Sequence, residues 1–455
     1  MNKITFAIVP LADIEFGERF RRDYGNLKEL IQSFKDNEII QPLAVMKRQE
    51  VTNGDKGHVL LAGGRRFKAA SEAGFDSVPC RIYDKDLSDL EIRSIELAEN
   101  VHRKDLDWYE KVELTKRIHD LQIQIYGKKT STSPDAKGWS QTDTANFLGS
   151  DRTLVTKDLA LAEAMEQIPI LRECKTADEA AKLLRKMKTM ASNEVIANEV
   201  KNRNANTPEE RLRSQLINSF ILENFTNGIR SVPDKSIGFI EIDPPYSIDL
   251  KENKNSGEGV DLNLAGYNEI EQATYLPFMR RVLSECYRVM QDNSWLILWF
   301  GPEPWFESLY MLLIETGFVT NRIVGIWNKV TGQTRRPDMY LANSYEMFFY
   351  ARKGEARIVK QGRSNVLDYR PVAPQYKIHP TERPIEMIQD LISTFTLPNA
   401  RVLVPFLGSG NTLLAANNLG MQSFGYELTK EYKDSFIVKV STSKIGQFSS
   451  YGGKP

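Results

Sequence analysis

The chain has 455 residues, with 60 lysines and arginines against 60 aspartates and glutamates, so its formal net charge is zero. This length predicts two or three domains rather than one. A neutral total gives no global nucleic-acid signature, so a basic surface that faces DNA must be local and balanced elsewhere.

The sequence gives no sign of a membrane protein, a disulfide-linked protein or a metal-binding protein. No segment approaches 18 apolar residues, and the N-terminus lacks the residue order of a signal peptide, so we expect no membrane span and a cytoplasmic protein. The four histidines are too scattered for a metal cluster, so no metal site is predicted. The cysteines, Cys80, Cys174 and Cys286, are expected to be buried free thiols.

Short strands and helices alternate over the first 125 residues. Apolar residues at helical spacing, short apolar runs and glycine breaks set the expected elements. The pattern predicts helices over 27–37, 65–73, 87–100 and 108–126, and strands that include 43–45, 59–62 and 77–83.

Two polar boxes interrupt this region. Gly63-Gly64-Arg65-Arg66 lies at a strand-to-helix junction, which can bind phosphate through backbone N–H groups and guanidinium contacts. A solvated helix start is the plainer interpretation. The second box, Glu99-Asn100-Val101-His102-Arg103, brings a carboxylate, an amide and a base together, or is simply a charged helix end.

A polar loop over 127–138 precedes two capped segments, 140–149 and 152–165, joined by a short turn that contains glycine. This order is typical of a helix-turn-helix, although an ordinary helical hairpin has the same pattern. We expect the second helix to contact a DNA groove or phosphates through Arg152, Thr153, Thr156 and Lys157. Residues 175–212 are predicted to be a connecting helix or linker with a break at 202–207.

Together, the two boxes, an upstream Gln41-Pro42 and the helix-turn-helix resemble the partition protein ParB over about residues 5–165. The resemblance implies a DNA-binding module and, at its boxes, CTP with Mg²⁺. Gly64 stands where the family has glutamate, which weakens the expectation of hydrolysis more than that of the fold. The nucleotide-binding residues that the resemblance implies are Gly63, Gly64, Arg65, Arg66, Glu99, Asn100 and Arg103.

Asp243-Pro244-Pro245-Tyr246 directly follows an apolar run over 237–242 that reads as a buried strand. Pro245 has no N–H to compete for the Pro244 carbonyl, so this carbonyl and the Asp243 carboxylate can both accept hydrogen bonds from one exocyclic amine. Tyr246 can stack on the ring that carries the amine. A plain turn at the end of a strand is the alternative.

A glycine-rich turn follows a second predicted strand, over 402–404, and leads into a helix that starts near Thr412. Glycines let the backbone approach a ligand, and a helix N-terminus offers free N–H groups. The next strand ends in Glu427, which is placed to bind ribose hydroxyls. The expected cofactor residues of this segment are Phe406, Gly408, Ser409, Gly410, Thr412 and Glu427.

These motifs resemble the amino-group DNA methyltransferases that use S-adenosylmethionine, in the arrangement in which the catalytic motif precedes the cofactor loop. The resemblance covers about residues 220–440 and adds Thr381, near the methionine end of the cofactor. An aspartate at the first catalytic position favours adenine N6 over cytosine N4. Val404 departs from the family, which usually has an aspartate there that helps to hold the cofactor.

We therefore expect an α/β protein: a small ParB-like domain (1–125), a helix-turn-helix with a helical linker (126–205) and a Rossmann-like methyltransferase domain (210–455). The expected function is methylation of adenine N6 in double-stranded DNA. The alternative is a non-catalytic DNA-binding clamp or regulator with a degenerate methyltransferase domain; methylation of RNA or protein amines is a weaker third. A homodimer is left open, and no restriction partner can be inferred.

Overall fold

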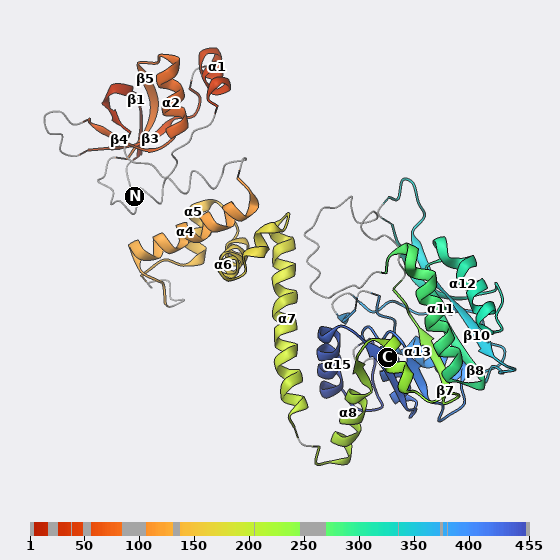
Figure 1. The fold of residues 1–455 in the computed structure, drawn as a ribbon. Coiled ribbons are helices and arrows are strands. Elements are labelled where there is room, and N and C mark those ends of the chain that lie inside the picture. Colours follow the sequence, from red (N-terminus) through yellow and green to blue (C-terminus); the bar gives the residue numbers. More distant parts are fainter. Residues whose placement is uncertain are drawn as a thin grey trace. The chain divides into compact units, whose positions relative to one another are not determined.

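The computed structural model describes residues 4–16, 26–37, 39–48, 56–83, 106–130, 137–203, 205–245, 270–334, 336–373, 376–379 and 381–451. The chain divides into two compact units, Met1–Arg185 and Lys186–Pro455 (Figure 1). Each unit has its own hydrophobic core. The division at residues 125 and 205–210 stays a prediction.

The first unit begins with a five-stranded mixed sheet in the order β1-β5-β3-β4-β2. Two helices pack on it, and their buried Phe34, Ala69 and Ala70 share a core with the strands. The predicted helices and strands of this region that fall on described residues are confirmed; the helix predicted over 87–100 lies outside them. The elements are β1 (Ile4–Pro10), β2 (Ile14–Glu15), α1 (Lys28–Asn37), β3 (Leu43–Lys47), β4 (His58–Ala62), α2 (Gly64–Ala73) and β5 (Ser77–Tyr83), with a 3-10 turn, η1 (Leu11–Asp13).

A helical region follows, and its two central helices begin where the caps predict. Ser140 and Asp143 form a capping box at the start of α5 (Gln141–Leu148), and the Asp151 side chain caps α6 (Arg152–Gln167). Gly149 ends α5 in the left-handed region (φ 61°), which glycine adopts without strain. The remaining elements are α4 (Trp108–Tyr126), η2 (Pro169–Glu173) and α7 (Ala177–Lys201).

The second unit is built on an eight-stranded sheet in the order β11-β9-β10-β8-β7-β12-β13-β6. Strands β8, β7, β12, β13 and β6 run parallel, whereas β10 is antiparallel to both β8 and β9. The strands are β6 (Phe220–Leu222), β7 (Ile237–Ile242), β8 (Met290–Phe300), β9 (Gly325–Gln333), β10 (Asn343–Lys353), β11 (Val366–Asp368), β12 (Val402–Val404) and β13 (Ser423–Glu427).

Helices cover both faces of this sheet (Figure 1). One core lies under α9 (Phe225–Gly228), α11 (Gln272–Val289) and α12 (Pro302–Thr316). The other lies under α8 (Pro208–Asn218), α13 (Ile385–Phe395), α14 (Asn411–Asn418) and α15 (Lys430–Thr442). A 3-10 turn, η3 (Ile229–Ser231), follows α9. Because the sheet is covered twice, β8 is buried without interruption from Ser294 to Phe300. This is the Rossmann-like α/β architecture that the sequence predicts.

The order of the strands reverses between β7 and β12. The chain proceeds from β7 to β8 on one side, and from β12 to β13 on the other. Loops that leave the carboxyl ends of two such strands diverge and open a crevice, which is where ligands bind in open α/β sheets. The Asp243 motif and the glycine-rich turn both begin at this point. No described helix is long and apolar enough to cross a membrane.

Leu403, in the middle of β12, is fully buried, whereas Leu397, a few residues earlier, is 69% exposed. We predict that Leu403→Ala lowers the free energy of unfolding by about 2–5 kcal/mol, because it leaves a cavity between packed layers. Leu397→Ala is the matched control and should change it by less than about 0.5 kcal/mol. Urea titration of the full chain measures both. Equal losses in the two variants would contradict this placement of β12.

Candidate active site

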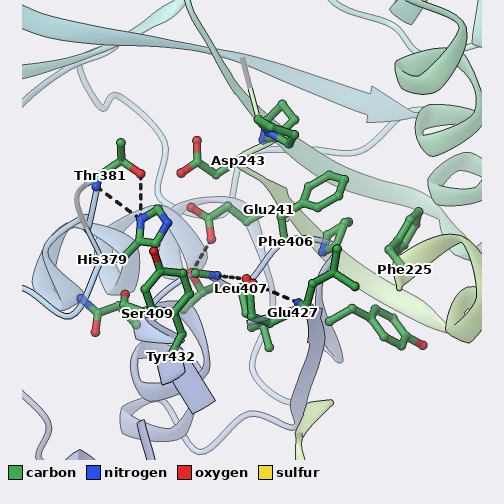
Figure 2. A pocket seen from close by; sticks show the side chains of 18 of the residues that line it. Phe225, Glu241, Asp243, His379, Thr381, Phe406, Leu407, Ser409, Glu427 and Tyr432 are labelled. Carbon is green, nitrogen blue, oxygen red and sulfur yellow. Dashed lines mark hydrogen bonds between the residues drawn. The ribbon is translucent and has the colours of Figure 1, made fainter. Parts of the chain in front are cut away.

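A cavity of about 410 Å³ opens at the crevice between β7 and β12. It gathers residues from segments that are far apart in the sequence, as Figure 2 shows for Asp243, Thr381, Phe406 and Glu427. The residues predicted from the sequence that line it are Asp243, Pro244, Pro245, Thr381, Phe406, Gly408, Ser409, Thr412 and Glu427.

Of the predicted residues that the structure describes, Gly410 does not line the cavity. Tyr246 lies outside the described residues. Gly410 (φ 78°) faces the core instead of the cavity: a Cβ there would lie 2.6 Å from the Phe436 ring. Only glycine fits this space between α14 and α15, and a contact of the Gly410 backbone with a cofactor stays a prediction.

Glu427 fixes the glycine-rich turn from the neighbouring strand. The Gly408 N–H donates to Glu427 Oε2 at 2.9 Å, and the N–H groups of Leu428 and Thr429 donate to Oε1, each at 3.0 Å. The carboxylate thereby joins the ends of β12 and β13. It lies at the tip of the second strand, where the sequence places a ribose-binding acid.

One wall of the cavity is aromatic. The Phe406 ring lies 6.0 Å from that of Phe225 and 5.9 Å from that of Phe278, between ring centroids. Figure 2 shows Phe225 and Phe406 on the side of the cavity away from His379 and Thr381. A wall of this kind suits a flat heteroaromatic ring. Phe225, the first residue of α9, is not predicted from the sequence, because no motif around this short helix marks it.

Asp243 is held by a buried arginine. Arg383, 4% exposed, donates from Nη1 to Asp243 Oδ2 and from Nη2 to Glu346 Oε2 at 2.9 Å, and its guanidinium lies 4.1 Å from the centre of the Trp299 ring. Burial raises the pKa of Glu346, but the charges of Arg383 and Lys329 outweigh it and leave that pKa below its usual range. The arginine therefore orients the Asp243 carboxylate. The sequence alone assigns no role to Arg383 or Glu346.

His379 forms the polar side of the cavity with Thr381. Its Nδ1 accepts from the Thr381 N–H at 3.3 Å and lies 3.0 Å from the Thr381 hydroxyl, and its ring packs edge-on against Tyr432. Burial lowers the pKa of His379, more than the surrounding carboxylates raise it. The ring is accordingly neutral at pH 7 and acts as a hydrogen-bonding and packing group.

The cavity lining is strongly acidic. Among the described residues it contains five carboxylates and one guanidinium, those of Glu223, Glu241, Asp243, Glu382, Glu427 and Arg383. A site of this charge favours a ligand that carries positive charge. S-adenosylmethionine fits this cavity: its sulfonium and ammonium suit the acids, its ribose suits Glu427, and its flat adenine suits the aromatic wall. No group of three or more His, Cys, Asp or Glu residues in the described chain is arranged to hold a metal ion.

In the first unit, the arginines of the glycine box bind the backbone of the preceding loops. Arg66 Nη1 donates to the carbonyls of Gln41 (3.2 Å) and Pro42 (2.9 Å), and Arg65 Nη2 donates to that of Asn26 (2.8 Å). Gly63 (φ 97°) turns the chain into α2, whose first residue is Gly64. Glu99, Asn100 and Arg103 lie outside the described residues, so binding of CTP and Mg²⁺ stays a prediction.

The four predicted DNA contacts share the first turns of α6. Arg152, Thr153, Thr156 and Lys157 are all exposed, and buried Val155 and Leu159 hold the opposite side of the helix in the core. The Thr156 hydroxyl lies 2.7 Å from Gln141 Oε1 of α5, which links the two helices of the helix-turn-helix.

Comparison with known proteins agrees with both halves of this description. A family model described as DNA methylase (N6_N4_Mtase) matches residues 237–439, and the ParB N-terminal domain model matches residues 2–101. The chain thus joins a ParB N-terminal domain to a DNA methylase domain of the N6_N4_Mtase family.

Individual relatives divide in the same way. The putative methylase YubD of Escherichia coli is 26% identical over 215 residues, which are 47% of this chain and 86% of that protein. The type II methyltransferase M.BglII of Bacillus subtilis is 25% identical over 264 residues, 48% of this chain and 68% of that protein. A probable plasmid-partitioning protein ParB of Thermus thermophilus is 40% identical over 90 residues, 20% of this chain and 28% of that protein.

We predict that Arg383→Met lowers the free energy of unfolding by about 3 kcal/mol or more, because it removes the guanidinium that the Asp243 and Glu346 carboxylates share and leaves Glu346 with Lys329 alone. Combining it with Glu346→Gln should cost less than the sum of the two single losses, since the amide removes one uncompensated charge. Urea titration of the two single variants and the double variant measures the coupling. Strict additivity would show that Arg383 and Glu346 do not act as a pair.

Proposed function

We propose that the protein transfers a methyl group from S-adenosylmethionine to the N6 amine of adenine in double-stranded DNA. The observation that carries this proposal is the convergence of the catalytic motif, the glycine-rich turn, Thr381 and Glu427 on one acidic cavity at the strand reversal. The DNA methylase family of residues 237–439 supports the reaction class.

Different residues of the cavity would bind different parts of the cofactor. Phe225 and Phe406 would hold the adenine ring, Glu427 the ribose hydroxyls, and the side of His379 and Thr381 the methionine portion. S-adenosylmethionine supplies an electrophilic methyl group on its sulfonium. The glycine-rich turn brings backbone close to this ligand, and Gly408 is fixed for that purpose by its hydrogen bond to Glu427.

Asp243 and the Pro244 carbonyl would accept both hydrogens of the target amine. This keeps the nitrogen lone pair out of conjugation with the base and directs it at the methyl group. Arg383 contributes by fixing the Asp243 carboxylate before the base arrives. Tyr246 would stack on the base, which must leave the duplex at a cost of a few kcal/mol. Positioning and electrostatics carry the reaction, and no covalent nucleophile is needed.

The first unit supplies DNA engagement in this proposal. The connection between β10 and α13, about residues 355–377, is too short to hold a full recognition domain. The exposed side chains of α6 are placed to bind a groove or phosphates. We place the enzyme in the cytoplasm, with a homodimer and CTP with Mg²⁺ at the glycine box as further expectations from the ParB resemblance.

A non-catalytic DNA-binding clamp is the second candidate, and Val404 is the observation that favours it. Its side chain is 2% exposed and belongs to the core, so the end of β12 carries no acid. Binding of S-adenosylmethionine by the full chain separates the two functions, because a degenerate domain would not bind it.

Asp243→Ala tests the reaction. We predict that the wild type transfers label from methyl-labelled S-adenosylmethionine to unmethylated DNA as N6-methyladenine, and that the variant loses at least about a hundredfold in rate, because the amine loses its main acceptor. Asp292→Asn is the control and should retain the rate, because Asp292 is an exposed acid at the start of β8, the end of this strand that lies away from the cavity. Label in N4-methylcytosine would show that the target base is cytosine instead of adenine. No label with DNA still bound would favour the clamp.

Replacing Arg152 and Lys157 by alanine tests the assignment of DNA binding to α6. We predict weaker binding to all sequences and a plot of log affinity against log salt that is shallower by about 2, because two phosphate contacts are lost. Lys186→Ala with Lys188→Ala, two exposed lysines of α7, is the matched control. An unchanged salt slope would remove α6 from the interface.

A further inference from the structure

Glu241 is a buried acid that the mechanism above leaves without a role. It lies on β7, two residues before Asp243, is 5% exposed, and forms part of the cavity wall. Its neighbours on the strand, Ile240 and Ile242, are fully buried and apolar. A carboxyl group in such a position is costly unless its oxygens are satisfied.

Both oxygens of Glu241 have donors. Trp299 Nε1 donates to Oε1 at 2.9 Å, and the Thr412 hydroxyl donates to Oε2. Burial raises the pKa of Glu241, although the charge of Arg383 and these two hydrogen bonds oppose it. A glutamine could serve Trp299 and Thr412 equally well without a second acid beside Asp243. Structural hydrogen bonding alone therefore does not explain an ionisable group here, whereas a cationic ligand does.

The strand register places Glu241 beside Val404. Phe239 pairs with Val402 and Ile240 with Leu403, so the next step along the parallel strands sets Glu241 next to Val404. Phe239, Val402 and Val404 belong to one core, which shows that these alternate positions share a face of the sheet. The acid that β12 lacks at its end is thus present on the adjacent strand, on the same face.

The position of Glu241 also indicates which part of a ligand it meets. Figure 2 shows Glu241 between Asp243 and the glycine-rich turn, and in this view it lies nearer to His379 than to Phe225. Alternate residues of a strand are roughly 7 Å apart, so a group bound at Glu241 lies within a few bonds of the reacting centre at Asp243. In S-adenosylmethionine the positively charged group at that distance from the methyl, apart from the sulfonium itself, is the ammonium of the methionine portion.

We propose that Glu241 is the anionic contact for the ammonium group of S-adenosylmethionine, and that β7 thereby supplies the acid that Val404 leaves absent from β12. This inference rests on the proposed function. When the cation binds, it favours the ionised carboxylate and offsets the cost of its burial. Thr412 and Trp299 hold the carboxylate in place before the ligand arrives.

The test compares two ligands that differ in the amino-acid portion. S-adenosylhomocysteine has the ammonium, whereas 5′-methylthioadenosine lacks the whole amino-acid end. With the full chain, we expect Glu241→Gln to raise the Kd for S-adenosylhomocysteine by about tenfold or more, because the complex loses one charged hydrogen bond. Binding of 5′-methylthioadenosine should stay within about twofold. Calorimetric titration measures both.

Two further variants make the result specific. Glu386→Gln changes an acid outside the cavity lining, where it binds Ser449 and Ser450, and should leave both ligands unaffected. Adding Val404→Asp to Glu241→Gln returns an acid to the same face and should recover part of the lost affinity. An unchanged melting temperature for Glu241→Gln shows that the fold is retained.

The outcomes are distinct. Equal binding of S-adenosylhomocysteine by wild type and Glu241→Gln would overturn the inference, as would equal losses for the two ligands, because either result removes the ammonium from Glu241. A wild type that binds neither ligand would overturn the proposed function and this inference together.

Discussion

The parallel pairing of β7 with β12 is the constraint on which the functional site depends. These strands are far apart in the sequence, and the chain leaves them in opposite directions along the sheet. Their diverging ends create the crevice and bring the Asp243 motif to the glycine-rich turn. A register shift of one residue would turn Glu241 to the other face and would separate it from Val404 and Thr412. The site is therefore specified by backbone hydrogen bonds before any ligand contact is made.

Charge is the second organising feature. The cavity concentrates carboxylates, yet each is fixed by a different partner: Asp243 by Arg383, Glu427 by backbone N–H groups, Glu382 by Asn411 and by the N–H of Ile378. These contacts preorganise the acids and leave the cavity with an excess of negative charge, which suits a cofactor that carries two positively charged groups and a net positive charge. The buried Arg383, between two carboxylates and over Trp299, links this binding chemistry to the acceptor of the target amine.

The sequence predicted part of the fold. Apolar periodicity, caps and glycine breaks predicted most helices and three strands of the first unit. In the second unit they predicted β7, β12, the start of α14 and β13, which ends in Glu427. Roles set by tertiary contact were not accessible. Arg383 bridges Asp243 and Glu346 only because the start of β10 and the segment before α13 meet at the end of the sheet where β7 finishes. The places of Glu241 and Phe225 in the cavity depend on strand register and on packing, and the Phe436 ring leaves no space for a side chain at Gly410.

Hydrogen–deuterium exchange of the full chain with and without S-adenosylhomocysteine tests the central claim, that the two strand ends form one cofactor site. We predict slower exchange in 405–412, 223–228 and 427–432 together, because these segments meet only in the folded cavity. Protection confined to the glycine-rich turn, or protection elsewhere in the chain, would contradict it.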